Sequence, residues 1–159
     1  MRCIFQVLRV KIFVLLFFYL SIPIDYASTA NPKKIIKENH PNVLKWSDKI
    51  LKYSGKHWRL VASIMDRENS GNNRPGILIA VYDRLGNFAG YDRARCGMQV
   101  VPYYHKDKIK GRNIDDPDVC VEVAMQVLIK CGIDRNYRKA LECYNPGADE
   151  SYYTDILEK

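Results

Sequence analysis

The chain has 159 residues, which suits one domain together with a targeting segment. Its hydrophobic fraction of 47% is ordinary for a folded protein, and it contains no low-complexity tract and no internal repeat, so the composition excludes a disordered or repeat protein. The formal charge of +7 suits an anionic partner but excludes nothing by itself.

The first thirty residues have the three-part layout of a secretory signal peptide. A basic start (Arg2, Arg9 and Lys11) precedes an apolar run at 12–22, which Pro23 ends, and small residues at 28–30 suit cleavage after Ala30. An uncleaved anchor is the alternative, but a spanning helix needs roughly 18 to 20 apolar residues. We therefore expect a signal peptide at 1–30, a domain at 31–159, and an exported protein, periplasmic or extracellular. The protein would be anchored in a membrane only if the signal peptide stayed uncleaved.

Cleavage would leave a mature chain with a moderate positive charge. It removes three basic residues and one acidic residue, which leaves 22 Lys+Arg, 17 Asp+Glu and a formal charge of +5. Nucleic acid and bacterial cell wall are both anionic partners for such a charge, and export argues against nucleic acid. A basic protein that is simply soluble is the alternative. Nothing in the sequence requires more than a monomer.

Four cysteines remain in the expected mature chain: Cys96, Cys120, Cys131 and Cys143. An even number in an oxidising compartment favours two disulfides. A metal site is a weak alternative, because there is no Cys-x-x-Cys pair and the three histidines, His40, His57 and His105, lie in scattered contexts. We expect neither a metal nor another cofactor.

The first half of the mature chain is predicted to be helical. Residues 31–39 form a short helix or a loose lead-in, and Pro41 can begin a helix that Gly55 ends. A second helix is expected from about 56 to 68 or 69, where the polar stretch 69–73 breaks it. The apolar run 77–82 and the turn at 83–87 predict a small hairpin.

The second half begins with a polar stretch, 103–117, that we interpret as a loop. Residues 118–131 have the clearest helical periodicity, with an acidic start and Gly132 at the end. Short helices are expected at 136–144 and at about 150–158. The predicted fold class is mostly α, with a minor β-hairpin and one modest core.

Glu68 is the strongest candidate for chemistry. Helical spacing puts it on one stripe with Val61, Ile64 and Met65, where an apolar residue is expected. Loss of water and the negative end of the helix dipole both raise the pKa of a carboxyl group there, and glycosidic cleavage needs such a neutral acid. The alternative is a glutamate that reaches solvent at the edge of the stripe. Its neighbours Asp66 and Arg67 fall off the stripe and are expected to be solvated.

Three segments resemble the lysozyme-like superfamily, in the order found in soluble lytic transglycosylase domains and goose-type lysozymes. Residues 64–71, IMDRENSG, resemble the helix end that carries the catalytic glutamate, although Asn69 replaces a usual serine. Residues 96–100, CGMQV, resemble the Gly-Leu-Met-Gln segment, and YHK at 104–106 looks closest to the goose-type branch. Residues 140–147, ALECYNPG, are similar to the Ala-Tyr-Asn-x-Gly signature.

The resemblance implies a sugar-binding groove, a substrate and residue roles. The substrate is the β-1,4 bond between N-acetylmuramic acid and N-acetylglucosamine in peptidoglycan. Glu68 would be the general acid and then the general base. Met98 would line the groove, Gln99 would position sugar or backbone, Tyr144 would hydrogen-bond Glu68, and Asn145 would hold the motif loop or the substrate.

The departures from the family pattern concern the same segments. Cys96 and Gly97 stand where Gly and Leu are usual, so the groove wall is expected to lose a leucine side chain. Cys143 stands where a small alanine is common. The apolar run 77–82 has no counterpart that we can assign.

Helix geometry limits the disulfide pairing. Cys120 and Cys131 are separated by three helical turns, roughly 16 Å of rise, so they cannot pair with each other. Two bridges would then link Cys96 and Cys143 to them, one each. Cys143 with Cys120 is plausible if the next helix folds back antiparallel, and a single Cys96–Cys143 bridge is the alternative.

A hydrolase usually needs a second carboxylate, whereas a lytic transglycosylase needs one acid. Asp83 and Asp92 are candidates for the second acid, although both suit solvated turns. This favours a transglycosylase, whereas the goose-type look of 104–106 favours a hydrolase. Two non-enzymatic classes stay open as well. One is a glycan-binding or scaffold protein, for example in an envelope-spanning machine, and the second is a small exported disulfide protein whose motif matches are due to chance.

Overall fold

The computed structural model describes residues 31–159, so the signal peptide expected at 1–30 lies outside the described residues. Within 31–159, no helix combines the length and the apolar character needed to cross a membrane.

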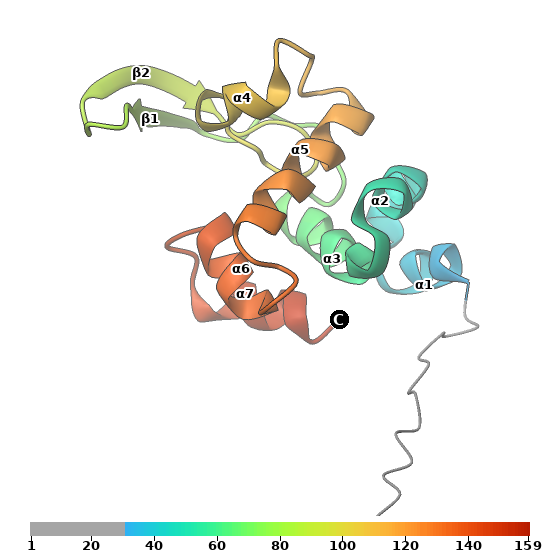
Figure 1. Ribbon diagram of the computed structural model, residues 1–159. Helices are drawn as coiled ribbons and strands as arrows, with labels where there is room; N and C mark the ends of the chain where they lie inside the picture. The colour runs from blue at the N-terminus through green and yellow to red at the C-terminus, as the bar shows by residue number, and fades with distance from the viewer. Residues whose placement is uncertain (1–30) are drawn as a thin grey trace, which may run out of the picture.

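The described chain is mostly helical with one small antiparallel hairpin, which confirms the predicted fold class. In Figure 1 the hairpin extends from one side of the molecule, while α6 and α7 lie together below α5. The elements are α1 (Pro32–Asn39), η1 (Pro41–Trp46), α2 (Ser47–Ser54), η2 (Gly55–His57), α3 (Trp58–Asn69), β1 (Leu78–Tyr82), β2 (Phe88–Arg93), η3 (Pro102–His105), α4 (Lys106–Ile109), α5 (Pro117–Lys130), α6 (Tyr137–Tyr144) and α7 (Glu150–Leu157).

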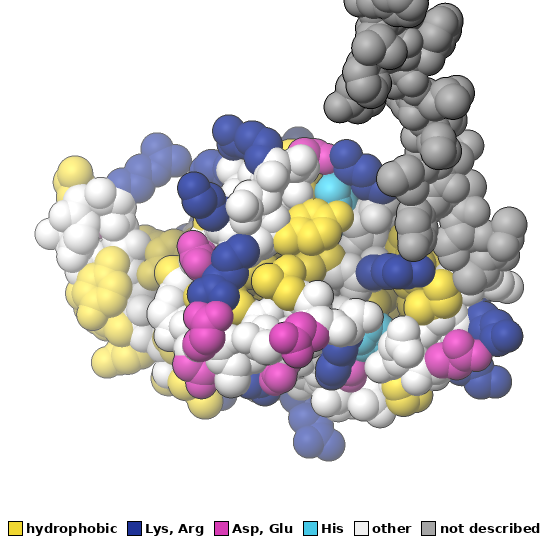
Figure 2. Space-filling model, turned by 90° about the horizontal axis from the view of Figure 1, so that it is seen from below, with side chains coloured by type: hydrophobic (Ala, Val, Ile, Leu, Met, Phe, Trp, Pro, Cys, Tyr) yellow, Lys and Arg dark blue, Asp and Glu magenta, His cyan; other side chains and the backbone are white. Residues whose placement is uncertain are grey.

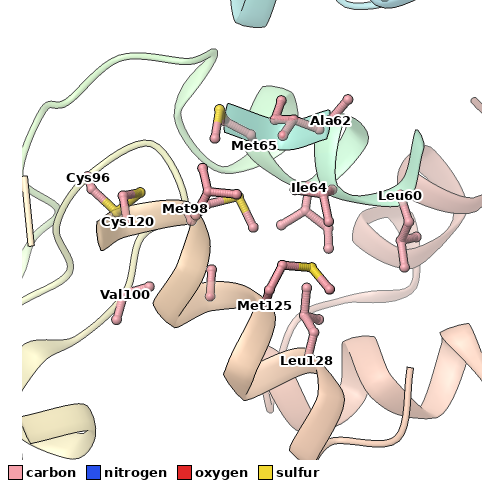
Figure 3. Packing of buried hydrophobic residues seen from close by; sticks show 14 of the residues in the cluster. Leu60, Ala62, Ile64, Met65, Cys96, Met98, Val100, Cys120, Met125 and Leu128 are labelled. Carbon is pink, nitrogen blue, oxygen red and sulfur yellow. A yellow bond between two sulfur atoms is a disulfide. The ribbon is translucent and has the colours of Figure 1, made fainter. Parts of the chain in front are cut away.

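The core lies mainly between α3, α5 and the turn that follows the hairpin. Ile64 and Met65 of α3 and Leu128 of α5 are fully buried in one cluster with Met98. Figure 3 shows Met98 directed into this packing, near Ile64 and Met125. Burial of these side chains supplies the main favourable free energy of folding and holds α3 against α5.

The segment 103–117 is not the simple loop that its polarity predicts. It contains η3 and α4 before α5 begins. Pro102 occupies the first turn of η3, where its fixed backbone angle suits a helical start, and Ile109 and Ile114 are buried. These two apolar side chains anchor a segment whose other residues are largely polar.

The start of α5 has the capping chemistry that its acidic sequence indicates. The Asp116 side chain accepts hydrogen bonds from the amides of Asp118, at 2.8 Å, and Val119, at 3.4 Å. Pro117 occupies the first turn, where its missing N–H costs nothing.

The predicted hairpin is present, and only a part of one face is buried. Val81 is buried, whereas Tyr82, Phe88 and Tyr91 are exposed and pack edge to face on each other. Asp83 closes the turn by accepting hydrogen bonds from the amides of Leu85 and Asn87. Figure 2 shows hydrophobic side chains gathered at this end of the molecule.

The disulfides are Cys96–Cys120 and Cys131–Cys143, with Cα–Cα distances of 6.0 and 5.6 Å. As the helix geometry predicts, Cys120 and Cys131 do not pair with each other. The suggested Cys120–Cys143 and Cys96–Cys143 bridges are wrong, because Cys143 of α6 returns to the C-terminal end of α5 and not to its start. The two bridges fit an oxidising compartment.

Asp66 is not solvated as the helical stripe predicts. Its side chain is only 12% exposed, and its Oδ2 lies 3.2 Å from Nδ1 of the buried His40. The other ring nitrogen of His40 lies 3.3 Å from the Ser63 hydroxyl, which also donates to the Arg59 carbonyl. The linker between α1 and η1 covers this face of α3, so the three side chains form a buried structural network.

The end of α3 is held by a close backbone contact. The Gly71 carbonyl accepts a buried 2.7 Å hydrogen bond from the Trp46 indole, and Gly71 has a φ of +65°. A Cβ atom at Gly71 would lie 2.6 Å from the Asn42 carbonyl oxygen. Only glycine suits both the angle and the space.

We expect Gly71→Ala to destabilise the protein by more than about 2 kcal/mol, from left-handed strain and steric overlap together. Gly111→Ala is the matched control, because Gly111 has a φ of +75° but no atom within 4 Å of the added methyl group. It should cost only about 1 kcal/mol. Urea unfolding measures both, and equal losses would contradict the close contact at Gly71.

Candidate active site

Glu68 lines a cleft with a volume of about 560 Å³. The walls come from the end of α3, from β1 and the segment before it, from the segment 94–105, from α5 and from the junction between α6 and α7. Most of them are apolar, including Ile77, Ile79 and Val127. A largely apolar cleft with a few polar groups is typical of a ligand site.

The Glu68 carboxylate is held by side chains from the C-terminal region of the domain. The Tyr152 hydroxyl, on α7, donates a hydrogen bond to Oε1 of Glu68. The Asn145 side-chain amide, just after α6, lies 3.5 Å from the same oxygen. Because α3 packs against α7, these donors fix the carboxylate at the wall of the cleft.

Burial raises the pKa of Glu68 above its ordinary value, as the apolar stripe predicts. The hydrogen bond from Tyr152, the charge of Arg67 and the Asn145 amide oppose this shift because they favour the charged form. Glu68 is therefore biased towards the neutral acid, while groups that stabilise its carboxylate are already in place.

Tyr144 lines the cleft but does not make the hydrogen bond that the resemblance implies. Its hydroxyl donates to the Met98 carbonyl at 2.7 Å. Burial, and then the charge of Glu68, raise the pKa of Tyr144, so its phenol stays protonated. The phenol that donates to Glu68 is Tyr152 instead. Tyr144 connects α6 to the turn at 96–99.

Met98 and Gly97 face the core and do not line the cleft as the resemblance predicts. Met98 is fully buried between α3 and α5. A Cβ atom at Gly97 would lie 3.2 Å from the Trp46 ring and 3.3 Å from Met65. The expected loss of a leucine from the groove wall is therefore wrong, since position 97 points away from the cleft.

Gln99 lies at the cleft wall and links two loops through hydrogen bonds. Its amide nitrogen donates to the Arg74 carbonyl at 3.2 Å and to the Cys96 carbonyl at 3.0 Å. Cys96 and Gln99 both have positive φ, and the residues on either side, Arg95 and Val100, form a β-bridge. This tight turn directs Met98 inward and Gln99 to the cleft.

Neither candidate second acid lines the cleft. Asp83 is committed to the hairpin turn, and both of its oxygens accept hydrogen bonds there. Asp92 accepts hydrogen bonds at 2.8 Å from the backbone amides of Arg93 and Tyr103. Within residues 31–159, Glu68 is the one carboxylate in the cleft wall.

Two residues of the site were not assigned a role from the sequence. Tyr152 belongs to an apolar stripe with Ile156, but nothing local indicates that it reaches Glu68. His105 lines the cleft, and its buried Nδ1 has no hydrogen-bond partner among the described residues. The part of the chain that the structure describes contains no cluster of three or more His, Cys, Asp or Glu side chains arranged to hold a metal ion.

Comparison with models of known protein families, with curated proteins and with solved structures finds no match for this chain.

We expect Tyr152→Phe to raise the pKa of Glu68 further, because it removes a hydrogen bond that stabilises the charged carboxylate. Carbon-13 NMR titration of the glutamate carboxyl groups measures the shift. Tyr153→Phe is the matched control, since the Tyr153 hydroxyl donates to the Asn145 carbonyl and not to Glu68. A lower pKa in Tyr152→Phe would contradict the arrangement.

The raised pKa also predicts how stability changes with pH. Folding favours neutral Glu68, so its contribution to stability declines as pH rises above the ordinary value of 4.5. We expect Glu68→Gln to melt at a higher temperature than wild type at pH 7, and the difference to shrink below pH 4.5. Glu158→Gln, at an exposed position, should follow wild type throughout. Calorimetry across pH tests this, and a less stable Glu68→Gln at pH 7 would contradict it.

Proposed function

We propose that this protein is a lytic transglycosylase that cleaves the β-1,4 bond between N-acetylmuramic acid and N-acetylglucosamine in peptidoglycan. The observation that carries the proposal is the state of Glu68, a partly buried carboxyl group with a raised pKa in the wall of a cleft. A carboxyl group with a raised pKa is the kind of acid that protonates a glycosidic oxygen.

The resemblance to the lysozyme-like superfamily supports the same reaction. The three similar segments are far apart in the chain, and 77 residues separate Glu68 from Asn145. Nevertheless Glu68, Gln99, Tyr144 and Asn145 all line one cleft. Chance matches to short motifs give no reason for this convergence.

In the proposed reaction, neutral Glu68 donates its proton to the oxygen of the leaving sugar as the glycosidic bond breaks. The positive charge that develops on the muramyl ring faces a carboxylate that Tyr152 and Asn145 stabilise. That carboxylate then accepts the proton of the muramyl 6-hydroxyl as this oxygen bonds to the anomeric carbon. The product is a 1,6-anhydro end, and Glu68 returns to its neutral form.

The single carboxylate favours this reaction over hydrolysis. An enzyme that uses water usually needs a second acid to hold it or to act as nucleophile. Asp83 and Asp92 are both committed to backbone amides outside the cleft. A goose-type hydrolase is therefore the second candidate, and the resemblance of residues 104–106 supports it, since Tyr104 and His105 line the cleft.

The proposed substrate implies an exported protein, periplasmic or extracellular, that acts on glycan strands. Two disulfides fit that setting, and the expected signal peptide would deliver the chain to it. Association with an envelope-spanning machine is compatible with such a location.

The test is digestion of purified peptidoglycan by wild type, Glu68→Gln and the exposed control Glu158→Gln, with mass analysis of the released sugars. We expect wild type and Glu158→Gln to release fragments lighter by one water than lysozyme products. Glu68→Gln should be slower by at least about a hundredfold.

Different products would change the conclusion. Ordinary reducing ends that depend on Glu68 would establish the hydrolase. Binding of peptidoglycan without any release would place the chain among glycan-binding or scaffold proteins, and neither binding nor release would contradict every cell-wall function.

A further inference from the structure

A second pocket, of about 520 Å³, lies beside the Glu68 cleft. Its walls come from the hairpin turn, from η3 and α4, and from the end of α5. We call it the cationic pocket and define it by Arg84, Lys106, Lys108, Lys130, Tyr103 and Tyr104. Tyr104 also lines the Glu68 cleft, so the two spaces share a wall.

The charge of the cationic pocket is not balanced by its own acids. Asp107 forms an ion pair with Lys108 at 2.9 Å, and Asp83 is occupied by the hairpin turn. Within residues 31–159, Arg84, Lys106 and Lys130 form no ion pair with either acid of the pocket. Three cations around one concave surface attract an anion of matching size.

Aromatic rings shape the floor of this pocket. The Lys106 ammonium lies 4.4 Å from the centre of the Tyr103 ring, and Tyr103 packs edge to face on Tyr104. The Tyr104 hydroxyl accepts a 3.3 Å hydrogen bond from the Tyr82 amide, which ties η3 to the hairpin. The contact with the Tyr103 ring favours a position of the Lys106 ammonium at the pocket wall.

The charge of the pocket reaches the neighbouring cleft. His105 belongs to the Glu68 cleft, and burial lowers its pKa together with the nearby positive charges of Lys108 and Lys130, against an opposing effect of Asp107. A ligand that occupies the cleft therefore lies close to these cations, on the side where Tyr104 forms the shared wall.

We propose that the cationic pocket binds the carboxylate groups of the peptide stem that branches from the muramyl sugar held in the Glu68 cleft. This rests on the proposed function, because only a glycan strand in the cleft would bring a stem to the pocket. In this arrangement the glycan backbone occupies the apolar cleft, and the anionic peptide stem branches from the glycan towards the cationic pocket. The enzyme would then prefer stem-bearing strands to bare ones.

The test compares glycan strands that carry stem peptides with the same strands after an amidase has removed the stems. The proteins are wild type, Arg84→Gln/Lys106→Gln/Lys130→Gln, and the control Lys37→Gln/Lys45→Gln/Lys139→Gln, each expressed as the full chain and purified. The control loses the same charge at exposed positions outside both pockets. Circular dichroism verifies that both variants fold. If the triple variant of the cationic pocket does not fold, the single variant Lys130→Gln replaces it.

We expect wild type and control to cleave stem-bearing strands with a kcat/KM about tenfold to a hundredfold above that for bare strands. The pocket variant should lose this preference and match wild type on bare strands. Equal cleavage of both substrates by wild type, or equal losses in the pocket and control variants, would overturn the inference.

Direct binding separates this inference from the proposed function. Calorimetric titration uses the free stem peptide with its carboxylates intact and the same peptide with its carboxylates amidated. Binding of the acidic form alone, lost in the pocket variant, would support the pocket even if no strand were cleaved. Absence of binding together with cleavage of bare strands would retain the enzyme and reject the pocket.

Discussion

The position of the Glu68 carboxylate depends on how α3 ends. The helix ends at Asn69, and Gly71 then lies against the backbone of Asn42, where its carbonyl accepts the buried Trp46 hydrogen bond. The last turn of α3 is thereby fixed against η1. The backbone position of Glu68 is thereby fixed, and the hydrogen bonds from Tyr152 and Asn145 then place its carboxylate in the cleft wall.

The turn at 96–99 contributes side chains to both the core and the cleft. Met98 enters the packing between α3 and α5, and Gln99 braces the wall of the cleft. The Cys96–Cys120 bridge ties this turn to the first part of α5, and Tyr144 donates to its Met98 carbonyl. The geometry of the cleft is therefore coupled to the packing of the core, because the same short turn contributes to both.

The Glu68 cleft and the cationic pocket adjoin each other but differ in polarity and charge. The Glu68 cleft is largely apolar and contains one partly buried acid with two neutral phenols nearby, Tyr144 and Tyr152. The cationic pocket beyond Tyr104 carries positive charges that its own acids do not neutralise. A ligand with a neutral backbone and an anionic branch would match both parts. A glycan strand with its peptide stem has this chemistry, so the two proposed sites would bind adjoining parts of one ligand.

The sequence alone determined most of the helices, the hairpin and the apolar surroundings of Glu68, since these follow from local periodicity, but it missed η3 and α4. The stripe through Val61, Ile64 and Met65 located α3 and the partial burial of Glu68, and helix rise excluded a Cys120–Cys131 bridge. Tertiary structure alone decided that Tyr152 donates to Glu68, that Met98 points into the core, that Asp66 is covered by His40, and which cysteines pair. Periodicity describes one face of one helix, whereas these contacts join elements up to 84 residues apart, whose relative placement only the packed core defines.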